Sequence, residues 1–379
     1  MNNHLETVFS DTKPHYALLD GLRGVAALLV VWYHVFEGYQ FGSGAAVIRE
    51  MNHGYLAVDF FFILSGFVIG YAYDDRWGKS LSTGGFFRRR LIRLHPMVVM
   101  GVALGVLTYC IQGCVQWDGT HIAPAAIVLA ALLTLFMLPA VPGGYTEVRG
   151  NGEMFPLNGP MWSLFFEYIG NILYALFIRR VGMRTLAVLT ALLGAGVVYV
   201  AVTNGQMGVG WTMAENGSGL CGGLVRMLFS YSAGMLVARV FRPVGVRFAF
   251  PLCATALVVL FALPYAGTEE MPWLNGLYDS ICIIAVFPAI VWVAASMKTP
   301  GKAAGKTFRA LGDISYPLYV VHYPFYYLFY AWLWRDPDNH ITFSQAWPVA
   351  LVLVPSCVLL AWLLYRFYDV PVRRWLSGR

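Results

Sequence analysis

The feature that most constrains this chain is its succession of apolar stretches, each long enough to cross a lipid bilayer as a helix. A membrane-spanning helix needs about 20 mostly apolar residues. Long runs of Leu, Val, Ala and Phe favour helices in these stretches. The sequence therefore predicts an all-α fold, a polytopic integral membrane helical bundle. The predicted segments are 17–37, 55–73, 97–115, 122–140, 160–178, 185–204, 221–240, 248–266, 276–297, 313–334 and 345–367.

The composition excludes several classes of protein. Of the 379 residues, 58% are apolar or aromatic and only 12% are charged, whereas about a quarter of a soluble domain is charged. This balance excludes a disordered protein, a nucleic-acid-binding module and an ordinary cytosolic enzyme. The histidines and cysteines show no metal-ligand spacing, so we expect no metal. We expect one domain over 1–379, with a cytoplasmic N-terminal segment (1–15), no cleaved signal peptide and a short cytoplasmic tail (368–379).

The positions of Lys and Arg predict the topology. Basic residues beside spans mark the cytoplasmic face, and they cluster after the second, fifth, seventh, ninth and last segments. Three segments separate the clusters at 76–93 and 179–184, yet an even number of crossings must join two loops on one side. One segment between 97 and 140 should therefore be re-entrant or interfacial, and the break at Trp117–Thr120 makes 122–140 the candidate. About ten transmembrane helices then leave both termini cytoplasmic.

The first segment carries two ionisable residues, Arg23 and His34. An arginine inside a membrane helix costs roughly 3 kcal/mol on insertion scales, so it requires a partner or a water-filled cavity. Eleven residues of helix place Arg23 and His34 on nearly the same face, about 16 Å apart along the axis. We predict that this face lines a polar cavity. Alternatively, Arg23 snorkels to the inner headgroups and pairs with Asp20, and His34 is a structural hydrogen-bonding group.

Two carboxylates and a second histidine lie in other segments. Asp59 follows an outer loop at a predicted depth similar to that of His34, and a carboxylate beside an imidazole fixes its tautomer and favours its protonated form. Glu167 lies about two turns into its segment, and His322 lies near mid-membrane. Together with Arg23 these residues predict a polar cavity through the bundle. Each could instead be a satisfied core polar group, and Asp59 could simply face interfacial water.

An arginine cluster precedes the third segment. On a helix, Arg89 and Arg93 would share a face, and forked guanidinium groups suit the phosphates of a nucleotide-like cofactor. The alternative is that the cluster only marks the cytoplasmic side. Four arginines fall within six positions, more than a topology signal requires: Arg88, Arg89, Arg90 and Arg93.

Taken in order, these stretches resemble the membrane-bound acyltransferase-3 family. The spacing of Arg23 and His34 matches the family's R-x10-H signature. Gly54–Phe67 is similar to its FF-x-LSGF segment, and Phe87–Pro96 to its RR-x-x-RL-x-P segment. The ending Tyr365–Pro371 is similar to YR-x-x-E-x-P, with Asp in place of Glu. Further correspondences, within a resemblance that covers about 16–375, lie at Trp162, Ser163, Glu167, Tyr316 and His322.

The resemblance implies acyl transfer, usually of acetyl, from acyl-CoA to a hydroxyl of a carbohydrate or glycolipid. It also implies the bacterial inner membrane as the location, with lipid as a neighbour and acetyl-CoA as the expected co-substrate. Some relatives carry an extra extracytoplasmic esterase-like domain, and we expect this chain to be the form without it. A separate extracytoplasmic partner or a homo-oligomer therefore remains open.

Combined with the resemblance, these features give each group an expected role. His34 acts as general base on the acceptor hydroxyl or as a transient acyl carrier, with Asp59 or Glu167 orienting it, and Arg23 holds or polarises the acyl end. The phosphates of the donor bind Arg88, Arg89, Arg90 and Arg93. The substrate cavity includes Trp162, Ser163, Tyr316 and His322.

Two other classes of function remain open. A transporter or flippase for a glycan or lipid-linked sugar would use the same polar cavity. The chain shows no paired halves with matching broken helices, which disfavours this class. A non-catalytic membrane subunit that senses or scaffolds is the other alternative.

Overall fold

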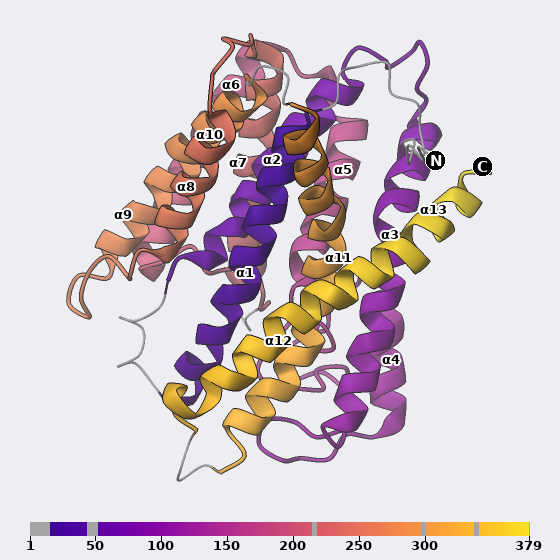
Figure 1. Ribbon diagram of the computed structural model, residues 1–379, viewed down its shortest axis with the longest axis vertical. Helices are drawn as coiled ribbons and strands as arrows, with labels where there is room; N and C mark the ends of the chain where they lie inside the picture. The colour runs from indigo at the N-terminus through magenta and orange to yellow at the C-terminus, as the bar shows by residue number, and fades with distance from the viewer. Residues whose placement is uncertain (1–15, 44–51, 214–217, 297–300, 337–340, 379) are drawn as a thin grey trace.

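The computed structural model describes residues 16–43, 52–213, 218–296, 301–336 and 341–378 (Figure 1). Its regular structure is helical, and these ranges contain isolated β-bridges but no strand. The helices are α1 (Ala17–Ser43), α2 (Ala57–Tyr73), α3 (Thr83–Ile111), α4 (Pro124–Leu135), α5 (Met161–Leu176), α6 (Met183–Asn204), α7 (Ser218–Val240), α8 (Ala249–Ala262), α9 (Trp273–Ile281), α10 (Phe287–Ala295), α11 (Lys302–Leu333), α12 (Phe343–Leu364) and α13 (Val370–Leu376).

Short turns of other helix types join or extend these helices. Two 3-10 turns lie at Gly54–Leu56 and Ile178–Arg180. Two π-helical turns, at Cys282–Val286 and Tyr365–Asp369, connect α9 to α10 and α12 to α13. A proline follows each π-turn closely, and its missing N–H cannot complete the regular helical ladder there.

The predicted fold class is confirmed. Each of the eleven predicted segments corresponds to a helix, counting α9 and α10 as one. Within the described ranges, eight helices are long and apolar enough to cross a membrane. The sequence analysis placed several boundaries wrongly, because polar helix termini look like loops. The arginine cluster belongs to the first turns of α3, α11 begins at Lys302, and most of the predicted tail is α13. The predicted segment 1–15 lies outside the described residues.

The basic clusters gather at one end of the bundle. The Arg239 guanidinium donates to the Asp74 carboxylate and to the Val181 carbonyl, each at 2.8 Å, which joins the ends of α2, α5 and α7. The Val246 amide donates to the Ser296 carbonyl at 2.9 Å, which adds the end of α10. We call this the basic end. Other loops meet at the opposite end of the bundle. There an isolated β-bridge pairs Glu153 with Thr212, and the His53 amide donates a 2.8 Å hydrogen bond to the Phe261 carbonyl.

The position of α4 explains the odd number of segments. The Ile122 amide before this helix binds the Cys114 carbonyl, and the Ala140 amide after it binds the Met154 carbonyl, so α4 begins and ends opposite the basic end. With 12 residues it is about 18 Å long, shorter than a bilayer core. Figure 1 shows it beside one half of α3. This agrees with the prediction for 122–140 and leaves ten described segments that connect the two ends.

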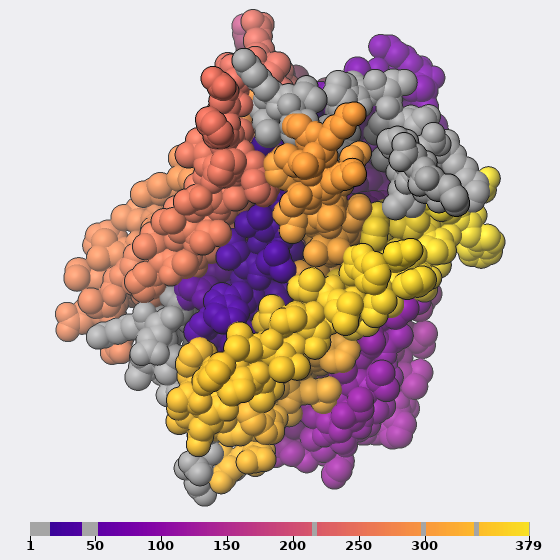
Figure 2. Space-filling model, in the orientation of Figure 1, coloured from indigo at the N-terminus to yellow at the C-terminus, as the bar shows by residue number. Residues whose placement is uncertain are grey.

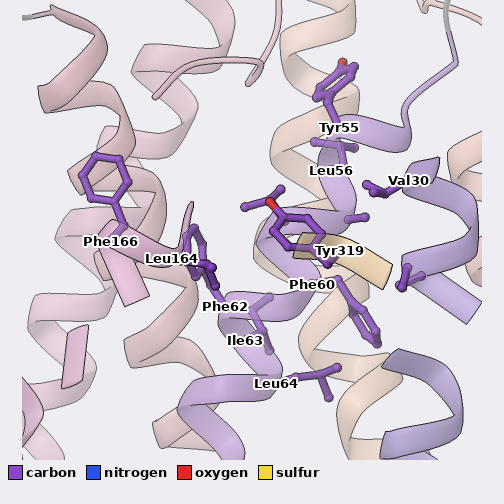
Figure 3. Close-up of a cluster of buried hydrophobic side chains, with 14 of the residues drawn as sticks. Val30, Tyr55, Leu56, Phe60, Phe62, Ile63, Leu64, Leu164, Phe166 and Tyr319 are labelled. Carbon is purple, nitrogen blue, oxygen red and sulfur yellow. The ribbon is translucent and has the colours of Figure 1, made fainter. Parts of the chain in front are cut away.

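The core is built around α2, whose buried side chains pack against those of several other helices. Figure 3 shows side chains of α2, among them Phe60 and Phe62, gathered with Val30 of α1, Leu164 of α5 and Tyr319 of α11. α12 and α13 instead cross one face of the bundle obliquely (Figure 2), and α12 turns many large apolar side chains outward. An outward apolar face is typical of a helix in contact with lipid.

Glycines set the closest helix contact, between α2 and α7. A Cβ at Gly66 would lie 2.0 Å from the Tyr231 carbonyl oxygen, and a Cβ at Gly234 would lie 2.0 Å from the Ile63 carbonyl oxygen. Both distances are far below van der Waals contact, so only glycine permits this approach. Small residues allow such backbone contact between membrane helices.

We expect Gly66→Ala to lower the free energy of unfolding by about 1–3 kcal/mol, because the added methyl forces α2 and α7 apart. The measurement is the thermal midpoint of the detergent-purified protein. Gly84→Ala is the control, since it lies on α3 with open space around it. Equal midpoints for Gly66→Ala and the wild type would contradict the close approach.

Candidate active site

The site lies along the antiparallel contact between α1 and α11. Gly24 allows these helices to meet, since a Cβ there would lie 2.5 Å from the Leu311 carbonyl oxygen. Two tyrosines of α11 then donate to backbone carbonyls of α1, Tyr326 to that of Val31 and Tyr330 to that of His34, each at 2.7 Å. These bonds fix both the register and the rotation of α1 against α11.

His34 has its carboxylate partner on its own helix. Its Nδ1 lies 2.5 Å from Oε2 of Glu37, almost one turn later. The same oxygen accepts hydrogen bonds from the hydroxyls of Tyr323 and Tyr330, at 3.1 and 3.2 Å. A carboxylate accepts a hydrogen bond from Nδ1, so Nδ1 carries the proton, and Nε2 has the lone pair whenever the ring is neutral. This is the tautomer that a general base requires.

A second imidazole stacks on His34. The rings of His34 and His322 have centroids 5.2 Å apart and an interplanar angle of 30°. His322 is fully buried, and its Nδ1 lies 2.9 Å from the Leu318 carbonyl, which can only accept. Its Nε2 therefore carries a lone pair, and this atom has no hydrogen-bond partner in the described part of the chain. The site thus places two imidazole rings side by side.

A cavity of about 80 Å³ adjoins His34, enough for a few water molecules. It contains two carboxylates, those of Glu37 and Glu153. Trp162, one of the residues expected in the substrate cavity, belongs to its wall, whereas Arg23 does not. Its walls combine charged and aromatic side chains, which are Tyr33, His34, Glu37, Tyr55, Glu153, Trp162, Trp211, Arg226, Tyr319 and Tyr323.

The predicted role of Asp59 requires correction. Asp59 is not an unpaired carboxylate that orients His34, because both of its oxygens bind Arg226, with Nη2–Oδ2 at 2.7 Å and Nε–Oδ1 at 2.9 Å. Arg226 also donates to the Tyr55 carbonyl at 2.7 Å. Both charged side chains are at most 1% exposed. The sequence analysis overlooked Arg226, although the cost of an arginine inside a span would have identified it.

Glu167 was expected to orient His34, but it pairs with a different residue. Its Oε1 lies 2.5 Å from Nη2 of Arg90 and accepts a hydrogen bond from Ser65 at 3.1 Å. Arg90 is therefore committed to an ion pair within the bundle. Arg88 is exposed and donates to the Leu376 carbonyl at 3.0 Å. The four arginines predicted to bind phosphate thus differ in how far their guanidinium groups are already bonded within the protein.

Arg23 and His34 share one helix face, as the spacing predicted, because both contact α11. Arg23 donates to the Ser315 hydroxyl at 2.8 Å and to the Gly312 carbonyl at 3.2 Å. It also pairs with Asp20 at 3.2 Å, which was the alternative expectation. The guanidinium therefore fastens α1 to α11 on the basic side of His34.

Two residues predicted for the substrate cavity make packing contacts instead. The Ser163 hydroxyl lies 2.7 Å from that of Tyr319, and the Tyr316 hydroxyl donates to the Leu94 carbonyl at 2.6 Å. Neither Ser163 nor Tyr316 belongs to the cavity wall. The predicted cavity residue His322 is also absent from the wall and lies behind it, stacked on His34. Ser163 contacts Tyr319, which does line the cavity.

Glu153 is a cavity residue that sequence reasoning missed. It lies in the connection between α4 and α5, is 4% exposed, and accepts hydrogen bonds from Tyr327 and Asn151. Burial raises the pKa of its carboxyl, and the charge of Arg149 partly offsets that effect. Nothing in the local sequence distinguishes Glu153 from a loop glutamate.

The arrangement can carry out proton transfer inside a membrane protein. An oriented imidazole next to a cavity is able to accept a proton from a bound hydroxyl, and Glu37 stabilises the resulting imidazolium. The described residues contain no group of three His, Cys, Asp or Glu side chains that could hold a metal ion. The fold and the site define an integral membrane protein whose cavity carries side chains suited to acid–base chemistry.

Sequence comparison gives the family of this protein. The chain belongs to the acyltransferase-3 family, whose acyltransferase domain matches residues 16–366. It is therefore a multi-pass membrane protein of the acyltransferase class, as the resemblance implied. No solved structure matches the chain.

The relatives differ in length and in the activity that their names state. Protein 2 in the picA locus of Rhizobium radiobacter is 38% identical over 193 residues, which are 49% of this chain and 94% of that protein. The acyltransferase MdmB of Streptomyces mycarofaciens is 25% identical over 95% of this chain and 92% of its own length. The peptidoglycan O-acetyltransferase OatA of Listeria monocytogenes is 23% identical over 96% of this chain but only 56% of its own length. The names of MdmB and OatA support an acyltransferase, and that of OatA an O-acyltransferase.

We expect Asp59→Asn to destabilise the protein by about 3–5 kcal/mol, since it leaves the buried Arg226 charge uncompensated. The double variant Asp59→Leu/Arg226→Met, which removes both charges, should recover at least half of this loss. Thermal midpoints of the three purified proteins provide the measurement. If the single and double variants are equally unstable, the ion pair is not the source of the effect.

Proposed function

We propose that this protein transfers an acyl group, in the simplest case acetyl, from acyl-coenzyme A to a hydroxyl of a carbohydrate or glycolipid. The observation that carries the proposal is the His34–Glu37 pair, which leaves an imidazole lone pair beside the cavity. The aromatic walls around it, including Trp162 and Tyr319, suit the faces of a sugar ring. The relatives named O-acetyltransferases support a hydroxyl acceptor.

The proposed reaction is a direct transfer. Nε2 of His34 takes the proton of the acceptor hydroxyl while that oxygen attacks the thioester carbonyl carbon. The tetrahedral intermediate then expels the coenzyme A thiolate, which receives the proton from Nε2. Glu37 holds Nδ1 and stabilises the imidazolium between the two steps. A transient acyl group on the imidazole is the alternative within this proposal.

The two substrates would approach from opposite ends. We place the basic end in the cytoplasm of the bacterial cell, with both termini there and the protein in the inner membrane. The donor then enters past the arginines near the start of α3. Glu153 lies in a loop at the other end and lines the cavity, so the acceptor would enter from that side.

Variants of the imidazole pair test the proposal. We expect His34→Ala to lower kcat for acetyl transfer by about 10²–10⁴-fold, the usual contribution of a general base. Glu37→Gln should lower kcat by about tenfold or more, because an amide no longer fixes the tautomer. The measurement is transfer of labelled acetyl by purified, folded protein to a cell-envelope fraction.

His121→Asn is the matched control for these variants, since His121 is an exposed histidine away from the cavity. Its kcat should equal that of the wild type. Wild-type turnover by His34→Ala would remove His34 from the mechanism.

Ligand-induced stabilisation separates the acyltransferase from a flippase. We expect coenzyme A and acetyl-coenzyme A to raise the thermal midpoint of the detergent-purified protein, because ligands that bind only the folded state stabilise it. A sugar flippase needs no coenzyme A site and should show no shift. Adenosine at the same concentration is the control, since it lacks the phosphates and the acyl group.

A further inference from the structure

The C-terminal helix α13 carries a buried arginine whose bonding is incomplete. Arg373 is 8% exposed, and its Nη2 lies 2.8 Å from Oδ2 of Asp369. Its Nε has no hydrogen-bond partner within the described residues, and neither has Oδ1 of Asp369. A buried guanidinium normally satisfies its donors, so a free Nε–H marks a place for an additional acceptor.

Arg93 of α3 is the second incomplete group. It is half-buried and makes no ion pair or hydrogen bond in the parts of the chain that the structure describes. Its charge acts on that of Arg373 and on that of Arg23, so three guanidiniums from α1, α3 and α13 lie near one another. Like charges in a partly buried place repel, and an anion between them would turn that repulsion into attraction.

The carboxylates of Asp313 and Asp369 act on Arg93 through their charge, but no hydrogen bond or ion pair joins them to it within the described residues. Asp20 is paired with Arg23, and Asp369 is paired with Arg373. Asp313 is the third acid of this region, and it accepts a hydrogen bond from the Tyr365 hydroxyl. Each acid thus has a hydrogen-bond or ion-pair partner other than Arg93, so the N–H donors of Arg93 remain available to a ligand.

The backbone explains how α13 reaches this place. The π-turn Tyr365–Asp369 adds a residue to the helical turn and changes the direction in which the following side chains point. Leu376, near the end of α13, accepts a hydrogen bond from Arg88 at 3.0 Å, which fastens α13 to the start of α3. Arg373 faces the bundle, whereas Arg374 is exposed.

We propose that Arg93 and Arg373 together bind the diphosphate of the acyl-coenzyme A donor, so that α13 forms one wall of the donor site. This inference rests on the proposed function, because it names where that donor is held. In the α3 cluster, Arg90 is bound to Glu167 and Arg88 to the Leu376 carbonyl, and Arg89 has interactions of its own. Arg93 is therefore the member of the cluster whose guanidinium is free to bind the diphosphate. Two guanidinium forks match the oxygens of a diphosphate.

The test compares Arg373→Gln with three acetyl donors. Acetyl-coenzyme A and its 3′-dephospho form both carry the diphosphate, whereas S-acetyl-pantetheine lacks every phosphate. We expect KM for the first two donors to rise about tenfold or more, the value of a lost charge-assisted hydrogen bond, with kcat little changed. KM for acetyl-pantetheine should stay at the wild-type value.

Arg374→Gln is the matched control, because it removes the same charge from the neighbouring, exposed position. It should change no KM by more than about threefold, the scale of an exposed charge. Asp369→Asn tests for a merely structural role. It removes the partner of Arg373, so KM for acetyl-coenzyme A should fall or stay constant. A rise equal to that in Arg373→Gln, or a rise for all three donors, would overturn the inference.

Thermal stabilisation by coenzyme A keeps the two proposals distinguishable. If the wild type is stabilised and Arg373→Gln is stabilised equally, the inference about α13 is wrong and the proposed function stands. If the wild type neither uses acetyl-coenzyme A nor is stabilised by it, both are wrong. We expect Arg373→Gln and Arg93→Gln to lose most of the stabilisation, and Arg374→Gln to keep it.

Discussion

The close antiparallel packing of α1 against α11 is the constraint on which the site depends. Gly24 lets the two backbones meet, and tyrosine hydroxyls of α11 occupy carbonyls of α1. With the register fixed, Arg23 reaches Ser315 near the basic end, and His34 stacks on His322 further along. A rotation of α1 would break both contacts at once, so the packing of these two helices determines where the imidazole points.

Two other sets of charges inside the bundle occur as complete ion pairs. Asp59 pairs with Arg226, and Glu167 pairs with Arg90. A buried charge without a partner is costly, so these pairs are required for the fold rather than available for chemistry. They also leave Glu37 as the carboxylate bonded to His34. The cavity is therefore polar because of the groups that remain on its wall, not because of every ionisable residue in a span.

Much of the architecture could be predicted from hydropathy and charge. Segment lengths give the helices. The parity of the basic clusters requires one non-crossing segment between 97 and 140, and the break at Trp117–Thr120 favours 122–140, where the short helix α4 lies. The shared face of Arg23 and His34 follows from helix geometry alone. Glu37 could also have been found this way, since residues three apart on a helix are neighbours, but its position near the end of the predicted segment hid it.

The ion pairs between helices could not be predicted, because a single sequence does not show which acidic side chain lies beside which basic one. Asp59, Glu167 and Arg226 are far apart in the chain, and only the packing of α2, α3, α5 and α7 selects their partners. The same holds for Glu153 and Arg373, which reach their places through a loop and a π-turn. The sequence by itself determined a helical membrane bundle and its catalytic imidazole candidate, since these depend on local hydrophobicity and helix period. The tertiary structure decided the partners, since these depend on distances across the bundle.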